Sequence, residues 1–228
     1  MESKTGLINE LLCKKSATKQ LVYKITSEVL TSFKEVMQEL QTDITPCLTE
    51  EAPTVQIKYY DKGDFEAHLR FSGDTIVVMM HTNIFNFDEN HFTSKSVYVK
   101  EDDLRGFCGM IQIYNFLYDT LKYNREQDAG YLVSRIFINK DKHFFVEGKR
   151  PLPFMYSDFD KLIINKEYIR SILEEVMLFC LNFDLQVPPL DAINYITLEQ
   201  KIAMSYSSGM PTQKRLGFTM SKETDTDL

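Results

Sequence analysis

Three apolar runs separated by two tight turns, between residues 54 and 82, constrain the fold of this 228-residue chain more than any other feature. The runs are rich in β-branched and aromatic residues, which favour strands, and each turn contains a glycine. The predicted strands are 54–60, 65–71 and 75–82. Because turns this short leave no room for a crossover, neighbouring strands must run antiparallel, and the stretch predicts a β-meander.

The two turns also predict how these strands pair. A three-residue turn at 61–63 has Gly63 available for the left-handed position, and Ser72-Gly73 fits a two-residue turn. The predicted cross-strand pairs are Tyr60 with Asp64, Lys58 with Glu66, Leu69 with Ile76, and Ala67 with Val78. Both pairings place alternate apolar side chains on one face, so we expect that face of the sheet to be buried.

A further hairpin is predicted at 130–149, where two β-branched and aromatic runs flank the polar turn 139–142. Its second strand ends in the triplet Glu147-Gly148-Lys149. If the turn spans 140–142, Arg135 lies directly opposite Glu147, and the two side chains can form a cross-strand ion pair. The meander 54–82 and this hairpin together indicate an antiparallel sheet.

Two long helices are predicted, one before and one after these strands. Apolar residues recur every three or four positions over 16–41 and over 165–183, which gives each helix an apolar stripe, and Asn165 can cap the second helix. The first stripe consists of Val22, Ile25, Val29, Phe33, Val36 and Leu40. Residues 42–53 contain two prolines and are expected to form a connector.

Residues 104–124 admit two interpretations. Their large apolar residues follow helical spacing, and acidic residues at 101–103 are typical of a helix start. Gly106 and Gly109 weaken a helix, however, and 110–114 also fits a strand. We favour the helix. The predicted fold class is then α+β, an antiparallel sheet with the helices 16–41, 104–124 and 165–183 packed on its apolar face.

The domain organisation follows from the prolines near residue 188. Residues 1–187 are predicted to form the main α+β domain, and the pair Pro188-Pro189 ends its last layer. Residues 188–218 are expected to be a C-terminal extension packed on that domain. The polar residues 219–228 are expected to be a disordered tail.

Composition disfavours several classes of function. The net charge of −7 opposes binding to a phosphate backbone, so nucleic acid is not an expected partner. No run approaches the ~18 apolar residues of a membrane span, and the first 20 residues carry only a short apolar patch of Leu7, Ile8, Leu11 and Leu12. The four scattered cysteines show no ligand spacing and are expected to be free thiols. We therefore expect a cytoplasmic protein without membrane association.

The triplet at the end of the 130–149 hairpin carries the sharpest chemical hypothesis. A carboxylate and an ammonium two residues apart share one face of a strand, so Glu147 can hold a divalent cation while Lys149 meets a phosphate. With Asp128 before the preceding strand, this arrangement resembles the PD-(D/E)xK nuclease pattern over roughly 22 residues. The resemblance implies a metal-dependent phosphodiesterase with Asp128 and Glu147 as metal ligands and Lys149 as a catalytic residue. An ordinary ion pair between Glu147 and Arg135 is the structural alternative.

No other catalytic pattern accompanies this triplet. The chain has no GxSxG, P-loop or GxGxxG sequence, and its four histidines show no metal-binding spacing. The predicted element order is similar to that of type III secretion chaperones, and this resemblance implies a module that dimerises or holds a partner segment. We therefore expect a non-enzymatic interaction or regulatory module, chaperone- or adaptor-like, with a protein partner or self-association and no cofactor. Aromatic residues in 84–92 and 154–159 are expected to leave apolar surface for that partner.

Overall fold

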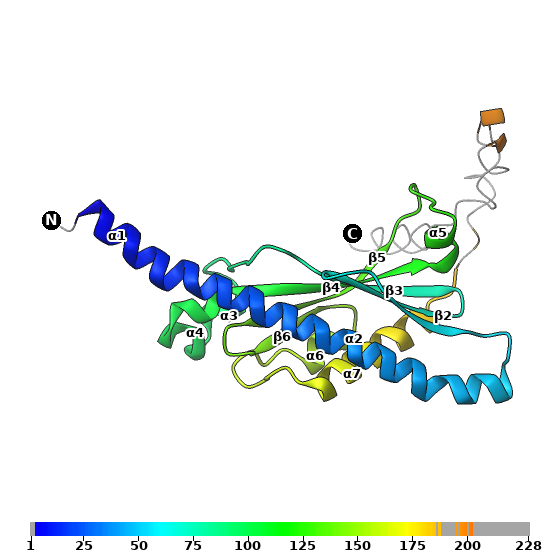
Figure 1. Ribbon diagram of the computed structural model, residues 1–228, viewed down its shortest axis with the longest axis horizontal. Coiled ribbons are helices and arrows are strands. Elements are labelled where there is room, and N and C mark those ends of the chain that lie inside the picture. The colour runs from blue at the N-terminus through cyan, green and yellow to red at the C-terminus, as the bar shows by residue number, and fades with distance from the viewer. Residues whose placement is uncertain (1–2, 186, 188–194, 196, 200, 203–228) are drawn as a thin grey trace, which may run out of the picture.

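Six strands form a single antiparallel sheet in sequence order, and helices accompany it (Figure 1), so the predicted α+β class is confirmed. The computed structural model describes residues 3–185, 187, 195, 197–199 and 201–202. The strands are β1 (Ile57–Asp61), β2 (Glu66–Phe71), β3 (Asp74–Met80), β4 (Cys108–Leu117), β5 (Tyr131–Asn139) and β6 (Phe144–Gly148). The helices are α1 (Lys4–Leu11), the π-helical turn η1 (Leu12–Ser16), α2 (Ala17–Glu51), α3 (Phe92–Lys95), α4 (Val97–Glu101), the 3-10 turn η2 (Asp103–Gly106), α5 (Tyr118–Lys122), α6 (Leu152–Met155) and α7 (Lys166–Leu181).

The main hydrophobic core lies between one face of the sheet and the helices α2 and α7. Apolar side chains of both helices and of the alternating strand positions form one buried cluster, as the two stripes predicted. The largest fully buried members include Phe33, Leu30, Leu69, Ile111, Ile136 and Phe144. We call this face of the sheet the inner face and the opposite face the outer face.

Helix α2 continues ten residues beyond its predicted end, so the connector predicted at 42–53 is wrong up to Glu51. Ile44 and Leu48 continue the apolar stripe by one turn each and pack against the main core. Pro46 therefore lies inside the helix. Side-chain packing along the stripe outweighs the loss of one backbone hydrogen bond at the proline.

The long helix predicted at 104–124 is also wrong, because Cys108–Leu117 forms strand β4, in the middle of the sheet. Strand β4 pairs with β3 on one side and with β5 on the other, which satisfies its backbone better than a helix containing two glycines. A Cβ atom at Gly109 would lie 2.0 Å from Thr26 Oγ1, so the glycine lets the strand pass directly beneath α2. The element order that resembles type III secretion chaperones required a helix here, and the chain does not have that order.

Of the three predicted hairpin registers, two are confirmed. Leu69 pairs with Ile76, and Arg135 pairs with Glu147 across a turn at 140–142. The register of the first hairpin is wrong, because Tyr60 pairs with His68 and Lys58 with Arg70. Lys34 of α2 accounts for the shift, since its Nζ donates to Asp61 Oδ1 (2.7 Å) and to the carbonyl of Gly63 (2.6 Å) and holds the turn in place. The shift is even-numbered, so every side chain keeps its predicted face.

The outer face has a partial cover at the end where β4, β5 and β6 meet. The segment 81–107, which includes α3, α4 and η2, lies over this end of the sheet and buries a second apolar cluster. The members of that cluster are Val99, Cys108, Met110, Phe137, Phe145 and Phe159. The predicted C-terminal extension at 188–218 is described only at Tyr195, 197–199 and 201–202, and the predicted tail at 219–228 lies outside the described residues.

Candidate functional site

A hollow of about 320 Å³ opens on the outer face beside Glu147, the residue that the sequence singled out. Segment 81–107 forms one wall, and β4, β5 and β6 form the floor. The lining residues are Phe85, Asn86, Phe87, His91, Met110, Arg135, Phe137 and Glu147. We call this feature the outer-face hollow. It combines three phenylalanine rings and one methionine with four polar side chains, as small-molecule sites commonly do.

Glu147 forms the ion pair that the hairpin register predicts. Nη2 of Arg135 donates a hydrogen bond to Oε2 of Glu147, and Nε2 of His91 lies 3.6 Å from the other carboxylate oxygen. On the opposite side of the imidazole ring, Nδ1 accepts from the backbone N–H of Thr93 (3.4 Å). The ring proton therefore belongs on Nε2, where it faces Glu147.

Thr93, His91 and Glu147 form a chain of contacts that resembles a nucleophile, a base and an acid. The Thr93 hydroxyl lies 2.8 Å from His91 Nδ1. However, Thr93 is only 1% exposed, so its hydroxyl cannot reach a substrate in solution. His91 caps the short helix α3 through the same nitrogen, and a capping role explains this geometry without catalysis.

Asp128, the second predicted metal ligand, has partners of its own. Its carboxylate is buried in the turn before β5, where it accepts from Thr120 Oγ1 (2.9 Å) and lies 3.9 Å from Arg125. Glu147 is not among these partners of Asp128, and the described residues contain no group of three His, Cys, Asp or Glu side chains suited to a metal ion. The predicted metal site has no geometric support in the described part of the chain.

Lys149, the predicted catalytic lysine, extends toward the inner face. Its Nζ lies 4.9 Å from the centre of the Tyr131 ring, and Tyr131 stacks on Phe179 and packs against the main core. Glu147 contacts the outer face, so the two side chains do not share a face as the nuclease pattern requires. Gly148 between them has a structural explanation, since a Cβ atom there would lie 2.3 Å from the carbonyl oxygen of Val133.

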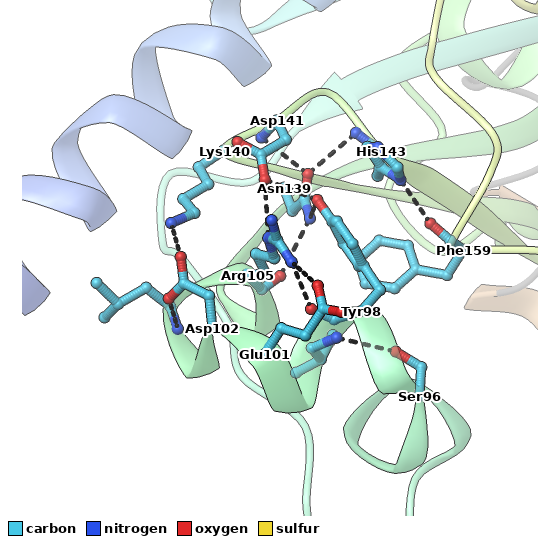
Figure 2. Close-up of polar contacts among 12 residues, drawn as sticks. Ser96, Tyr98, Glu101, Asp102, Arg105, Asn139, Lys140, Asp141, His143 and Phe159 are labelled. Carbon is cyan, nitrogen blue, oxygen red and sulfur yellow. Dashed lines mark hydrogen bonds and ion pairs between the residues drawn. The ribbon is translucent and has the colours of Figure 1, made fainter.

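A polar network fixes segment 81–107 against the tip of the β5–β6 hairpin (Figure 2). Asn139 is fully buried, and its Oδ1 accepts from the backbone N–H groups of Asp141 and His143, each at 3.0 Å. Its Nδ2 donates to the Tyr98 hydroxyl (3.1 Å) and to the carbonyl of Arg105 (3.2 Å). The Tyr98 hydroxyl donates in turn to Asp141 (2.7 Å), and burial raises the pKa of this hydroxyl. One asparagine thus joins the hairpin turn to the wall of the outer-face hollow.

The N-terminal end of the long helix presents a different kind of surface. Every described side chain from residue 3 to residue 17 is exposed, and in Figure 1 these turns extend beyond the end of the sheet. We call residues 4–16 the N-terminal arm. The four large apolar residues of the arm lie on one side of the helix and are each about half exposed: Leu7, Ile8, Leu11 and Leu12.

The arm is anchored to the rest of the molecule at its base. Nζ atoms of Lys15 and Lys19 lie 5.7 and 5.1 Å from the ring centre of Phe107, at the end of segment 81–107. Sequence reasoning noted the four apolar residues of the arm only as a short patch. Their spacing of one and four residues was visible, but the sequence alone does not show which part of a long helix lies beyond the sheet.

Comparisons with family models, with curated proteins and with solved structures find no match to this chain. Among the described residues, no helix has both the length and the apolar character needed to cross a membrane.

Proposed function

We propose that this protein is a non-enzymatic interaction module that binds another protein through the N-terminal arm. The observation that carries the proposal is the exposed stripe of Leu7, Ile8, Leu11 and Leu12. Burying one such side chain from full exposure is worth about 1.5–3 kcal/mol, and each of these four is about half exposed, so covering the row would yield roughly half of that amount per residue. An amphipathic helix with this spacing is the element that docks into an apolar groove of a partner.

The arm is already helical before it binds. It continues through the π-helical turn η1 into α2, and Ser3 caps its first turn by accepting from the N–H of Gly6 (3.1 Å). A free peptide of this length would be mostly unfolded in water, because helix nucleation is unfavourable. A preformed helix loses less conformational entropy on binding, which favours affinity.

The charge of the arm indicates the chemistry of the partner. The described arm carries Lys4, Lys14 and Lys15 but only one acid, Glu10, which is paired with Lys14 at 2.8 Å. Two arms packed side by side would bring like charges together, which opposes self-association through this surface. The partner that fits is a different protein with an apolar groove and an acidic rim.

Site-specific photo-cross-linking tests this proposal in cells that produce the protein. A photoreactive residue at Leu11 should give a discrete adduct that is lost with Leu7→Asp, whereas the same probe at Asn9, on the opposite side of the helix, should give none. The adduct partner is then identified by mass spectrometry and purified. Leu7→Ala should weaken binding to the purified partner at least about tenfold, and added salt should weaken it further.

Three results would contradict the proposal. The first is the absence of any adduct from Leu11. The second is equal adducts from Leu11 and Asn9, which would indicate random collisions. The third is an adduct with twice the mass of this chain, which would show that a second copy is the partner.

A further inference from the structure

We propose that the outer-face hollow binds a small aromatic carboxylate. This inference does not depend on the N-terminal arm, because the hollow is built from β4, β5, β6 and segment 81–107. It also differs from the metal site predicted at Glu147, because the expected ligand is an organic anion.

The walls of the hollow fit a flat apolar ring. Phe85, Phe87, Met110 and Phe137 supply the apolar lining, and the rings of Phe87 and Phe137 meet edge to face with centres 5.2 Å apart. Aromatic and thioether side chains in this arrangement favour an aromatic guest. The volume of about 320 Å³ is sufficient for one or two fused rings.

The hollow is formed before any ligand arrives. Phe85 and Cys108 exchange two backbone hydrogen bonds of 2.8 and 2.9 Å, which tie segment 81–107 to the start of β4. The Asn139 network fixes the far end of the same segment to the hairpin tip (Figure 2). A preformed wall reduces the entropic cost of binding.

The polar groups at the mouth of the hollow are mainly hydrogen-bond donors. Asn86 Oδ1 accepts from the N–H of Phe87 (2.9 Å), which leaves the amide NH₂ group for another acceptor. His91 carries its proton on Nε2 because Nδ1 accepts from Thr93. Arg135 uses one nitrogen for Glu147 and lies 5.5 Å from the ring centre of Phe137, and its guanidinium has further N–H groups without a hydrogen-bond acceptor in the described part of the chain.

The charges of the side chains that line the hollow favour an anionic ligand. Glu147 is the single carboxylate among the lining residues, and Arg135 already neutralises it. A cationic ligand would meet the guanidinium with no free carboxylate to offset the repulsion. A carboxylate would accept from Arg135 and from Asn86, since the planar fork of an arginine can serve two carboxylates.

Three probes of matched shape test the ligand class: 2-naphthoate, 2-naphthamide and 2-naphthylmethylammonium. Each is titrated into the full-length protein, and binding is followed by saturation-transfer NMR. The acid should bind at least about tenfold more tightly than the amide and the amine, because it alone brings a negative charge to the guanidinium of Arg135. Equal binding of the three probes, or tighter binding of the amine, overturns the proposal.

Substitutions locate the site. Arg135→Gln should remove the preference for the acid while leaving binding of the amide unchanged. Arg70→Gln is the matched control, because Arg70 also lies on the outer face but packs on Tyr118, 3.5 Å from its ring centre, outside the hollow. Retention of the acid preference in Arg135→Gln would place the binding elsewhere and contradict the proposal.

Glu147→Gln should change the affinity for the acid in the opposite direction to Arg135→Gln. Removing the competing carboxylate frees Arg135, so affinity for 2-naphthoate should rise several-fold. A weaker response to the acid in this variant would contradict the proposal. Thermal unfolding checks that each variant is folded, and the ranking of the three probes on the wild-type protein remains decisive if a variant is not.

Discussion

The N-terminal arm and the buried part of α2 belong to one continuous helix and carry almost the same apolar pattern. Leu7, Ile8, Leu11 and Leu12 are exposed. The residues 18 positions later, which is about five α-helical turns, are Ile25, Thr26, Val29 and Leu30, and all four are buried. The pattern therefore determines that a helix forms and which side is apolar. The pattern does not determine what covers that side.

The π-helical turn η1 separates these two parts of the helix. Its wider i→i+5 hydrogen bonding takes up about one extra residue per turn, which rotates the arm by roughly 100° relative to a regular helix. The apolar side of the arm is consequently out of line with the buried stripe of α2. This change of direction supports a separate binding surface over a simple extension of the core.

Phe33→Ala in α2 and Leu11→Ala in the arm should differ most in their effect on the free energy of unfolding. Phe33 is fully buried between α2 and the sheet, so its truncation leaves a cavity and should lower the free energy of unfolding by about 3–5 kcal/mol. Leu11→Ala should change it by less than ~0.5 kcal/mol, because Leu11 is 49% exposed and belongs to no buried cluster of the described residues. Urea denaturation measures both values. Similar losses of unfolding free energy in the two variants would show that Leu11 is packed as tightly as Phe33 and would contradict an exposed arm.

The reaction rates of the cysteines should show the same difference between exposed and buried positions, without any substitution. Cys13 in the arm and Cys47 near the end of α2 are exposed, whereas Cys108 and Cys180 are buried and burial raises the pKa of the Cys108 thiol. A thiol reagent should modify the first pair at least about 100-fold faster, because the second pair reacts only when the fold opens. Mass spectrometry of digested protein over time identifies each site, and urea-unfolded protein, in which all four should react together, is the control.

Gly109→Ala tests the closest approach between α2 and the sheet. The new methyl group would collide with Thr26, so we expect a loss of about 1–3 kcal/mol in the free energy of unfolding. Gly73→Ala is the matched control, because no atom lies within 4 Å of the position that its Cβ would occupy. A neutral Gly109→Ala would show that α2 can move away from β4 at little cost.

Local turn chemistry explains which parts of the fold the sequence could predict. Ser72-Gly73 and the turn at 140–142 set two registers correctly because each depends on a few neighbouring residues. The register of the first hairpin was predicted wrongly because Lys34, from a helix distant in sequence, holds the turn of that hairpin. Strand β4 was not predicted because its side chains are buried on both faces of the sheet, for example Ile111 on the inner face and Met110 on the outer face. Its sequence therefore lacks the alternation of a half-exposed strand.

The candidate site was predictable only where it depends on strand register. The pairing of Arg135 with Glu147 followed from the hairpin turn. His91 and Asn86 reach the same hollow from segment 81–107, and no pattern in the sequence connects that segment to β6. Asp128 and Lys149 lie near Glu147 in the sequence, yet their side chains contact Thr120 and Tyr131 instead. Tertiary contacts, rather than sequence proximity, decide which side chains share a site.

Removing the arm should have the smallest effect on the free energy of unfolding but should abolish the proposed binding to the partner protein. A variant that begins at Lys14 lacks all four apolar residues of the arm but keeps Lys15 and Lys19 on Phe107. Its free energy of unfolding should stay within ~0.5 kcal/mol of the full chain, because the deleted side chains are exposed, whereas the cross-linked partner should no longer bind. Urea denaturation and a binding titration measure the two properties separately. A loss above ~1 kcal/mol would mean that the apolar side of the arm is covered by another part of this chain, and the arm would then be a structural element instead of a docking surface.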